Sequence, residues 1–196
     1  MTEQTNQTEH PDRLTDRAQL MDLMARYAQG VDRKDWAVVH GTYHTDAHDD
    51  HGEYKGGIDG FIDWVTRRHE KVEQSMHFLG NCLIEFTGPD TALMETYYIA
   101  KQTYAADATA ARRMLGDDAA PGPVEAEIWG RYVDLAERRD GVWRTARRTV
   151  VFEALHARPA TGLPLGGDWA RQHRNPDDPL YMMRRLAVER GKGSGE

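Results

Sequence analysis

The chain has 196 residues, of which 39% are hydrophobic and 29% are charged, with a formal net charge of −7 at pH 7 and one cysteine. These values are typical of a single globular domain with a short extension, and the negative charge argues against nucleic acid or an anionic membrane as the main partner. No apolar run approaches the roughly 20 residues that span a bilayer. The first residues also lack the features of a signal peptide. We therefore expect a cytoplasmic protein.

Helical spacing dominates the first third of the chain. A first helix is predicted from Thr15 or Asp16, either of which can cap it, to Asp32, and further helices are predicted over 36–42 and 58–65. Apolar residues recur at three- and four-residue spacing along the first helix and form one buried stripe: Leu20, Leu23, Met24, Tyr27 and Val31.

Strand patterns dominate the second half. A short strand is expected from Ala47, followed by a turn at Gly52, Gly56 and Gly57. Four longer strands are predicted where aromatic and β-branched residues are frequent: 76–86, 91–104, 125–137 and 142–155. Residues 106–123 are expected to form a long loop or an irregular hairpin tip. Because helices and strands are segregated, we predict an α+β domain, in which three N-terminal helices cover a curved antiparallel sheet. Such a sheet can form a cone-shaped barrel with a pocket at its mouth.

Three segments are expected along the chain. Residues 1–13 are polar and are predicted to be disordered, and residues 14–156 form the domain. Residues 157–196 form a C-terminal extension in which Gly, Pro, Asp and Arg are frequent, with one short helix over 180–187. This extension can wrap around the domain or around a neighbouring subunit.

An aspartate and a histidine are the strongest candidates for chemistry. Asp32 follows Val31 directly, so its carboxylate arrives where the helix still faces the core, and a buried carboxylate is costly without a partner. His77 opens a strand pattern and is the candidate partner. The alternative is that Asp32 caps the helix or pairs with Arg33 or Lys34, with His77 an ordinary core histidine.

Four histidines and three aspartates are dense enough in one segment to suggest a metal site: His40, His44, His48 and His51, with Asp46, Asp49 and Asp50. A strand from Ala47 would separate His48 from His51, so we expect no functional metal. On that strand Asp49 shares the face of His51 and can orient it. Cys82 lies in an apolar strand and is expected to be an inert thiol. No nucleotide-binding loop or nucleophile elbow is present in the sequence, and no cofactor is expected.

Short motifs over Leu14–Leu155 resemble the nuclear-transport-factor-2-like superfamily and, within it, the SnoaL-like enzymes. This group includes scytalone dehydratase, hexachlorocyclohexane dehydrochlorinase and bile-acid 7α-dehydratase. The motifs are Tyr27 before Val31-Asp32, Tyr-Lys-Gly at 54–56, Met76-His77 before Leu83-Ile-Glu-Phe86, and Arg139-Asp-Gly-Val-Trp143.

The resemblance implies an Asp32–His77 dyad and a pocket tyrosine at Tyr27. His51 stands where the bile-acid enzyme has a pocket tyrosine, and Phe152 stands where it has a functional arginine. We expect Asp32, His77, His51 and Tyr27 to be catalytic. Six further residues are expected to contact substrate: Tyr43, Asp49, Asn81, Arg131, Arg148 and Phe152. Of these, Arg131 or Arg148 would replace the functional arginine that the bile-acid enzyme has at the position of Phe152.

The expected function is that of a cofactor-independent lyase. His77, oriented by Asp32, would remove a proton from an apolar ring-containing substrate such as a steroid, a polyketide or a lignin-derived aromatic, with loss of water or formaldehyde. An isomerase would use the same base. A non-catalytic binding module or a small subunit of a ring-hydroxylating dioxygenase is the alternative from another class. The resemblance also implies a homo-oligomer, either a trimer or a dimer.

Overall fold

The computed structural model describes residues 11–116, 120–162 and 166–192. The predictions for residues 1–10, 117–119, 163–165 and 193–196 lie outside these ranges. Residues 11–13, predicted to be disordered, are instead the start of the first helix, which begins before the predicted cap at Thr15 or Asp16. Along the chain the elements are α1 (Pro11–Arg33), α2 (Trp36–Gly41), β1 (Tyr43–Asp50), β2 (Lys55–Gly57), α3 (Ile58–Arg68), β3 (Val72–Gly88), β4 (Thr91–Tyr104), α4 (Thr109–Arg112), the 3₁₀ turn η1 (Arg113–Leu115), β5 (Val124–Arg139), β6 (Val142–Pro159) and α5 (Pro179–Lys192).

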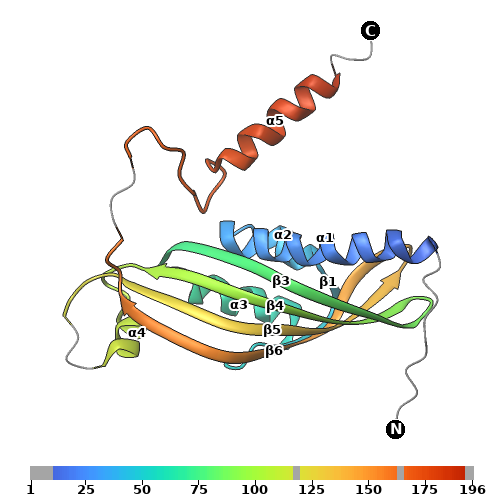
Figure 1. The fold of residues 1–196 in the computed structure, drawn as a ribbon, viewed down its shortest axis with the longest axis horizontal. Coiled ribbons are helices and arrows are strands. Elements are labelled where there is room, and N and C mark those ends of the chain that lie inside the picture. Colours follow the sequence, from blue (N-terminus) through green and yellow to red (C-terminus); the bar gives the residue numbers. More distant parts are fainter. Residues whose placement is uncertain (1–10, 117–119, 163–165, 193–196) are drawn as a thin grey trace.

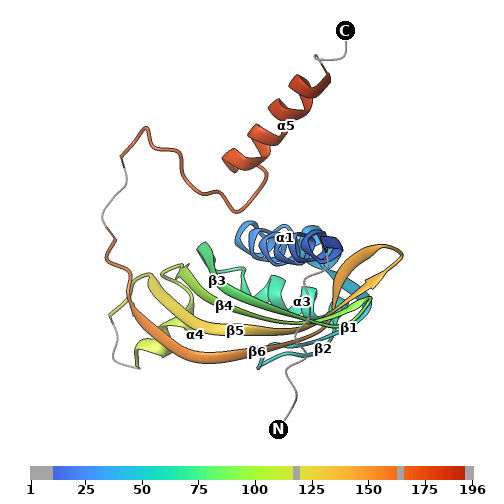
Figure 2. The ribbon, with the colours of Figure 1, turned by 45° about the vertical axis from the view of Figure 1, so that its right-hand side comes forward.

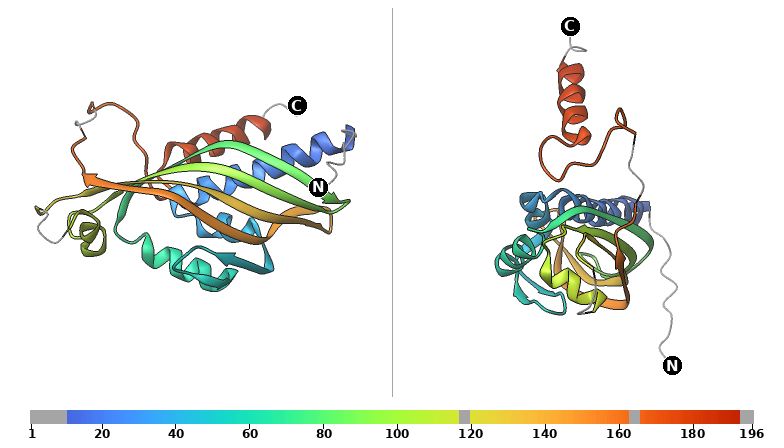
Figure 3. Two further views of the ribbon diagram at one scale, coloured as in Figure 1. Left: turned by 60° about the horizontal axis from the view of Figure 1, so that its bottom comes forward. Right: turned by 90° about the vertical axis from the view of Figure 1, so that its left-hand side faces the viewer.

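The strands form one six-stranded sheet in the order β2-β1-β6-β5-β4-β3. Neighbouring strands are antiparallel except β1 and β6, which run parallel. The sheet is strongly curved, α1 packs on β3 and β6, and α3 packs on β1 (Figures 1 and 3). This arrangement confirms the predicted cone-shaped α+β fold.

The core lies between the helices and the concave face of the sheet. The predicted stripe of α1 is buried, and its residues pack against inward-pointing side chains of the long strands. Along β5 the even-numbered residues point inward and the odd-numbered ones outward, as a half-buried strand requires. Burying one large apolar side chain in this way contributes about 1.5–3 kcal/mol.

The structure differs from the sequence prediction at several places. β1 begins at Tyr43 rather than Ala47, and residues 55–57, expected in a turn, form the short strand β2. The expected loop over 106–123 contains α4 and η1. β6 runs to Pro159, beyond its predicted end at 155, so the boundary placed at 156 falls inside a strand.

The C-terminal extension returns to the domain and then leaves it. After β6 the segment 166–178 passes beside the C-terminal end of α1, and α5 projects away from the body (Figures 1 and 2). The first turns of α5 are held to the domain, because the Tyr181 hydroxyl donates to Asp35 (2.9 Å) and Arg184 donates to Gln29 (2.6 Å). In the described part of the chain no helix is long and apolar enough to cross a membrane.

Candidate active site

A cavity of about 340 Å³ opens inside the cone, between α1, α3 and the concave face of the sheet. Most of its wall is aromatic or aliphatic: Val31, Trp64, Tyr98, Ile128, Tyr132 and Phe152. The polar groups on the wall include three histidines and one amide: His51, His69, His77 and Gln102. An apolar cavity with a few convergent polar side chains is the usual form of a small-molecule site.

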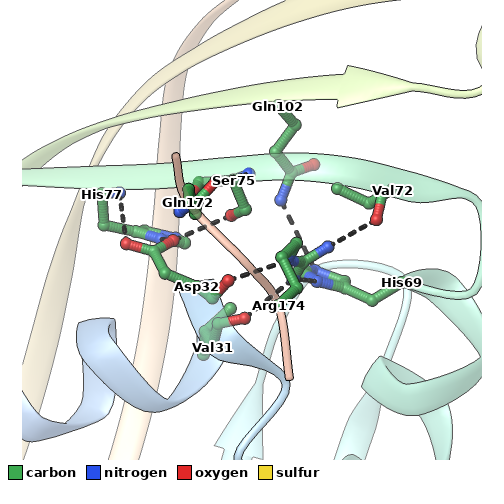
Figure 4. A network of polar contacts seen from close by, with 9 residues as sticks. All are labelled: Val31, Asp32, His69, Val72, Ser75, His77, Gln102, Gln172 and Arg174. Carbon is green, nitrogen blue, oxygen red and sulfur yellow. Dashed lines mark hydrogen bonds and ion pairs between the residues drawn. The ribbon is translucent and has the colours of Figure 1, made fainter. Parts of the chain in front are cut away.

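The Asp32–His77 pair lies on this cavity. Asp32 occupies the last turn of α1, and β3 carries His77 on the strand face that points toward α1 (Figure 4). The Nδ1–H of His77 donates to Asp32 Oδ1 at 2.7 Å, and the His77 backbone N–H donates to Oδ2 at 2.9 Å. Ser75 Oγ adds a third hydrogen bond to Oδ1, at 2.8 Å. The carboxylate therefore fixes the ring, and Nε2 of His77 is left for the cavity side.

The charge state of Asp32 follows from these contacts. Burial raises the pKa of the Asp32 carboxyl, but the hydrogen bonds and charge of His77, its backbone N–H and the Ser75 hydroxyl outweigh burial, so the pKa is lower than usual. Asp32 is thus an anion at neutral pH. An anion at Nδ1 stabilises the imidazolium that forms when Nε2 accepts a proton.

A second histidine–aspartate pair lies on the same cavity. His51 Nδ1 is 3.0 Å from Asp49 Oδ1, and the Tyr43 hydroxyl donates to Asp49 Oδ2 at 2.7 Å. The His51 ring lies beside Phe61 and Trp64, with ring centroids 5.1 and 5.5 Å away. Asp49 is fully buried and orients His51, as their shared strand face predicts. Tyr43 supports this pair from behind and does not line the cavity.

Three tyrosines form the floor of the site. Tyr27 and Tyr132 meet edge to face at 5.5 Å, and Tyr98 stacks on Tyr132 at 4.3 Å. Burial raises the pKa of Tyr27 and raises that of Tyr98 to about 12. Both phenols are therefore neutral at ordinary pH and can donate hydrogen bonds.

Arg148 lies behind the tyrosines rather than on the cavity wall. It is fully buried, donates two hydrogen bonds of 2.7 Å to Asp134, and places its guanidinium 4.1 Å from the Tyr27 ring centre. Burial lowers the pKa of Arg148, but the Asp134 charge outweighs burial and the net shift is upward. Its donors are used inside the core, on Asp134 and the Tyr43 hydroxyl, so the structure places Arg148 away from the cavity where a substrate contact was expected.

Two other predicted substrate contacts point outward. Arg131 is an odd-numbered residue of β5, faces away from the cavity and pairs with Glu95 and Glu153. Asn81 lies where the β3–β4 register shifts, between Leu79 and Cys82, and lines a groove on the outer face of the sheet. The irregularity reverses which residues point inward. Phe152, in contrast, lines the cavity.

The histidine cluster does not converge. His40 contacts Asp59 at 3.0 Å, and His44 contacts the Glu137 carbonyl oxygen at 3.0 Å, far from His51. Within the ranges that the structure describes, no three His, Cys, Asp or Glu side chains form a group able to hold a metal. Cys82 is half-buried, and burial raises the pKa of its thiol.

His69 is a site residue that sequence reasoning missed. Its charged neighbours in Arg67-Arg-His-Glu70 are typical of a solvated helix end. In the structure His69 is buried, lines the cavity and contacts the Trp36 ring edge to face, with the ring centroids 5.6 Å apart. The overlooked signal is the spacing, since His69 continues the buried series Phe61–Val65 by four residues.

The fold and the site together define a cone-shaped α+β domain that encloses a pocket with two histidine–aspartate pairs. The SnoaL-like domain family matches residues 12–149, and the chain belongs to this family. No curated protein is similar enough in sequence to match.

Solved structures show the same fold. A hexachlorocyclohexane dehydrochlorinase (LinA) type 2 is 20% identical, with a TM-score of 0.65 over 80% of this chain and 97% of that one. A candidate scytalone dehydratase from Novosphingobium aromaticivorans is 16% identical, with a TM-score of 0.61 over 78% and 97%. LinA type 3 from Novosphingobium barchaimii LL02 is 22% identical, with a TM-score of 0.62 over 79% and 97%. At these identities the likeness shows the fold, and the family resemblance expected from the sequence is confirmed.

Proposed function

We propose that the protein is a cofactor-independent lyase acting on an apolar, ring-containing substrate. One observation carries the proposal: Asp32 holds Nδ1 of His77 at 2.7 Å, which leaves Nε2 as a base beside a mostly apolar cavity. A histidine is a competent base near neutral pH because its ordinary pKa is about 6.5. The dehydrochlorinase and the candidate dehydratase with the same fold are named for eliminations, which supports this reaction class.

In the proposed reaction, Nε2 of His77 takes a proton from a substrate carbon, and the electrons of that C–H bond form a new double bond. The neighbouring C–O bond breaks, and the hydroxyl leaves as water after it accepts a proton. Tyr27, a neutral phenol, and His51 are the proposed donors. Because Nδ1–H of His51 is directed at Asp49, His51 donates from Nε2 only when both of its ring nitrogens are protonated. Loss of formaldehyde from an aromatic hydroxymethyl compound is a variant in which the base takes the hydroxyl proton. The C–C bond then breaks as the C=O bond of formaldehyde forms, and the released carbon keeps the electron pair and accepts a proton.

The cavity size refines the substrate class. A volume of about 340 Å³ is near the lower end of the roughly 300–1,000 Å³ of small-molecule sites. This size favours a one- or two-ring aromatic compound, such as a lignin-derived one, over a four-ring steroid. Phe152 and Trp64 would lie against such a ring.

The test is a screen of cyclic and aromatic alcohols by mass spectrometry without added cofactor. Wild type, His77→Ala and the control His40→Ala are compared, because His40 is an exposed histidine outside the cavity. We expect wild type and the control to give a product lighter by water or formaldehyde, and His77→Ala to give none. Equal product from His77→Ala would refute the dyad mechanism. An isomer of unchanged mass would indicate an isomerase, and binding without turnover a non-catalytic module.

We further propose that the protein is a cytoplasmic homo-oligomer, either a dimer or a trimer. The outer face of the sheet carries large exposed apolar residues: Met76, Phe78, Leu83, Tyr97 and Trp129. Such a patch commonly marks an interface. Light scattering should give a multiple of the 22.3 kDa chain mass, and Trp129→Asp should lower it. A wild-type mass of one chain would contradict the oligomer.

A further inference from the structure

The C-terminal extension reaches the back of the candidate active site. Segment 166–178 lies across the end of α1 and the free edge of β3, the last strand of the sheet (Figures 1 and 4). Asp178 anchors it, since Arg33 of α1 donates to Asp178 Oδ1 at 3.1 Å. The family match ends at residue 149, so this segment lies outside it.

Gln172 binds the strand edge beside the dyad. Its side-chain amide donates to the Ser75 carbonyl oxygen and accepts from the Ser75 backbone N–H at 3.3 Å. One amide thus occupies both backbone groups of an edge-strand residue, as a neighbouring strand would. The Ser75 side chain is the third hydrogen-bond donor to Asp32. The extension therefore fixes the backbone of Ser75, whose side chain in turn donates a hydrogen bond to the Asp32 carboxylate.

Arg174 joins three elements of the cavity wall (Figure 4). Its guanidinium donates to the carbonyl oxygens of Val31, Asp32 and Val72, each at 2.8 Å, and to His69 Nδ1 at 2.7 Å. The carbonyls at the end of a helix lack partners within the helix, and a cation is favourable there. Burial lowers the pKa of Arg174 to about 10, so the group remains a cation at neutral pH. It can only donate.

The contact with Arg174 determines the proton position on His69. Because Arg174 only donates, Nδ1 of His69 must accept, and the ring proton lies on Nε2. Nε2 is 3.4 Å from the Gln102 side-chain amide, which also lines the cavity. In Figure 4 the Gln102 amide nitrogen faces Nε2, and its oxygen accepts from the Tyr104 hydroxyl at 2.6 Å. A proton on Nε2 requires the amide to be turned over, so that its oxygen accepts from His69 and its NH₂ group donates to the Tyr104 hydroxyl oxygen.

The surroundings of His69 also oppose a positive charge on its ring. Burial lowers the His69 pKa well below 6.5, and the neighbouring Arg174, His77, Arg68 and Lys34 lower it further. Trp36 and Gln102, which also contact the ring, carry no charge. The ring is therefore a neutral hydrogen-bond donor within the cavity wall.

We propose that the C-terminal extension belongs to this site and that Arg174 is its positioning residue. Arg174 fixes the end of α1 that carries Asp32, and it holds His69 as the neutral Nε2–H tautomer. The catalytic consequence rests on the proposed lyase function. The tautomer of His69 does not depend on the lyase function, and it can be measured on the protein without any substrate.

The first experiment is nuclear magnetic resonance of ring-¹⁵N histidine in the full chain, with the His69 signals assigned by His69→Gln. At pH 7 the wild-type His69 should show an unprotonated Nδ1 and a protonated Nε2, with no titration down to pH 6. In Arg174→Ala the ring should become a mixture of tautomers and titrate at higher pH. A wild-type His69 that is charged, or protonated on Nδ1, would overturn the proposal even if Arg174→Ala does not fold. Unchanged signals in a folded Arg174→Ala would overturn it as well.

The second experiment uses the substrate found in the screen. Arg174→Ala should lower kcat at least tenfold with little change in KM, because Arg174 does not line the cavity. Arg174→Lys should restore part of kcat. Arg171→Ala is the control, since Arg171 donates to Gly166 within the same segment. Equal kcat in wild type and Arg174→Ala would refute the positioning role. If no substrate is found, the lyase proposal fails alone and the tautomer result stands.

Discussion

Asp32→Asn is the most informative single change, because it keeps the shape of the side chain and removes its charge. Three donors converge on the two Asp32 oxygens: His77 Nδ1 at 2.7 Å, Ser75 Oγ at 2.8 Å and the His77 backbone nitrogen at 2.9 Å. An asparagine offers one oxygen, so its NH₂ group must face at least one donor. If the asparagine oxygen accepts from the His77 backbone N–H, its NH₂ group faces Nδ1 of the His77 ring. Nδ1 must then accept, so the ring proton moves to Nε2, and Nε2 can no longer act as a base on the cavity side.

The size of the effect follows from the role of the base. A positioned general base contributes about 10²–10⁴-fold to the rate. At about 1.36 kcal/mol per factor of ten, the loss of transition-state stabilisation is about 2.7–5.4 kcal/mol. The free energy of unfolding should also fall by about 1–3 kcal/mol, because a buried donor loses its acceptor.

The assay compares kcat/KM of Asp32→Asn with wild type and with Asp22→Asn, a change at an exposed aspartate of the same helix. Urea unfolding of each variant gives the stability separately. We expect Asp22→Asn to match wild type in both measurements. An Asp32→Asn enzyme that folds and turns over within threefold of wild type would refute the reasoning.

Two further predictions concern the pocket wall. Burial holds His69 neutral in the folded chain, so below pH 6.5 the unfolded chain binds a proton that the folded one does not, and stability falls by up to about 1.4 kcal/mol per pH unit. Asp32, whose pKa is depressed, loses its own contribution only below about pH 3.8. Between pH 7.5 and 5, the free energy of unfolding measured in urea should therefore decrease more steeply for wild type than for His69→Gln. Parallel curves of this free energy against pH would contradict the prediction. Phe152→Ala should raise KM about tenfold and leave kcat nearly unchanged, because the substrate ring loses its contact with Phe152. Arg131 faces outward, so the control Arg131→Ala should change neither constant. Equal KM values in the two variants would show that Phe152 does not contact substrate.

The sequence contains enough to predict the fold, and the family resemblance adds the pairing of Asp32 with His77. The spacing of Leu20, Met24 and Tyr27 fixes the buried side of α1, and this side brings Asp32 to the core. Alternation in β5 defines an inward face, which holds Tyr132 and excludes Arg131. These local patterns have periods of 3.6 and 2 residues. They predict the structure correctly because the apolar side of each helix or strand packs into the hydrophobic core.

Other parts of the site could not be predicted in this way. Register shifts in β3 interrupt the alternation, so parity counting fails for Asn81. Arg174 bonds the Asp32 carbonyl from 142 residues away, in a segment without helical or strand periodicity. A contact of that kind depends on where the chain returns, which no local pattern encodes. His69 was recoverable from its spacing, but the charges around it indicated a surface position.

The central claim is that His77 is a base held by Asp32, and rescue of His77→Ala with imidazole tests it most directly. The variant lacks a ring beside the cavity, and free imidazole of similar basicity can occupy that space. Turnover without added cofactor should be lost in His77→Ala and partly restored as imidazole is added, with no effect of imidazole on wild type. A His77→Ala protein that turns over the substrate at the wild-type rate without imidazole would contradict the account.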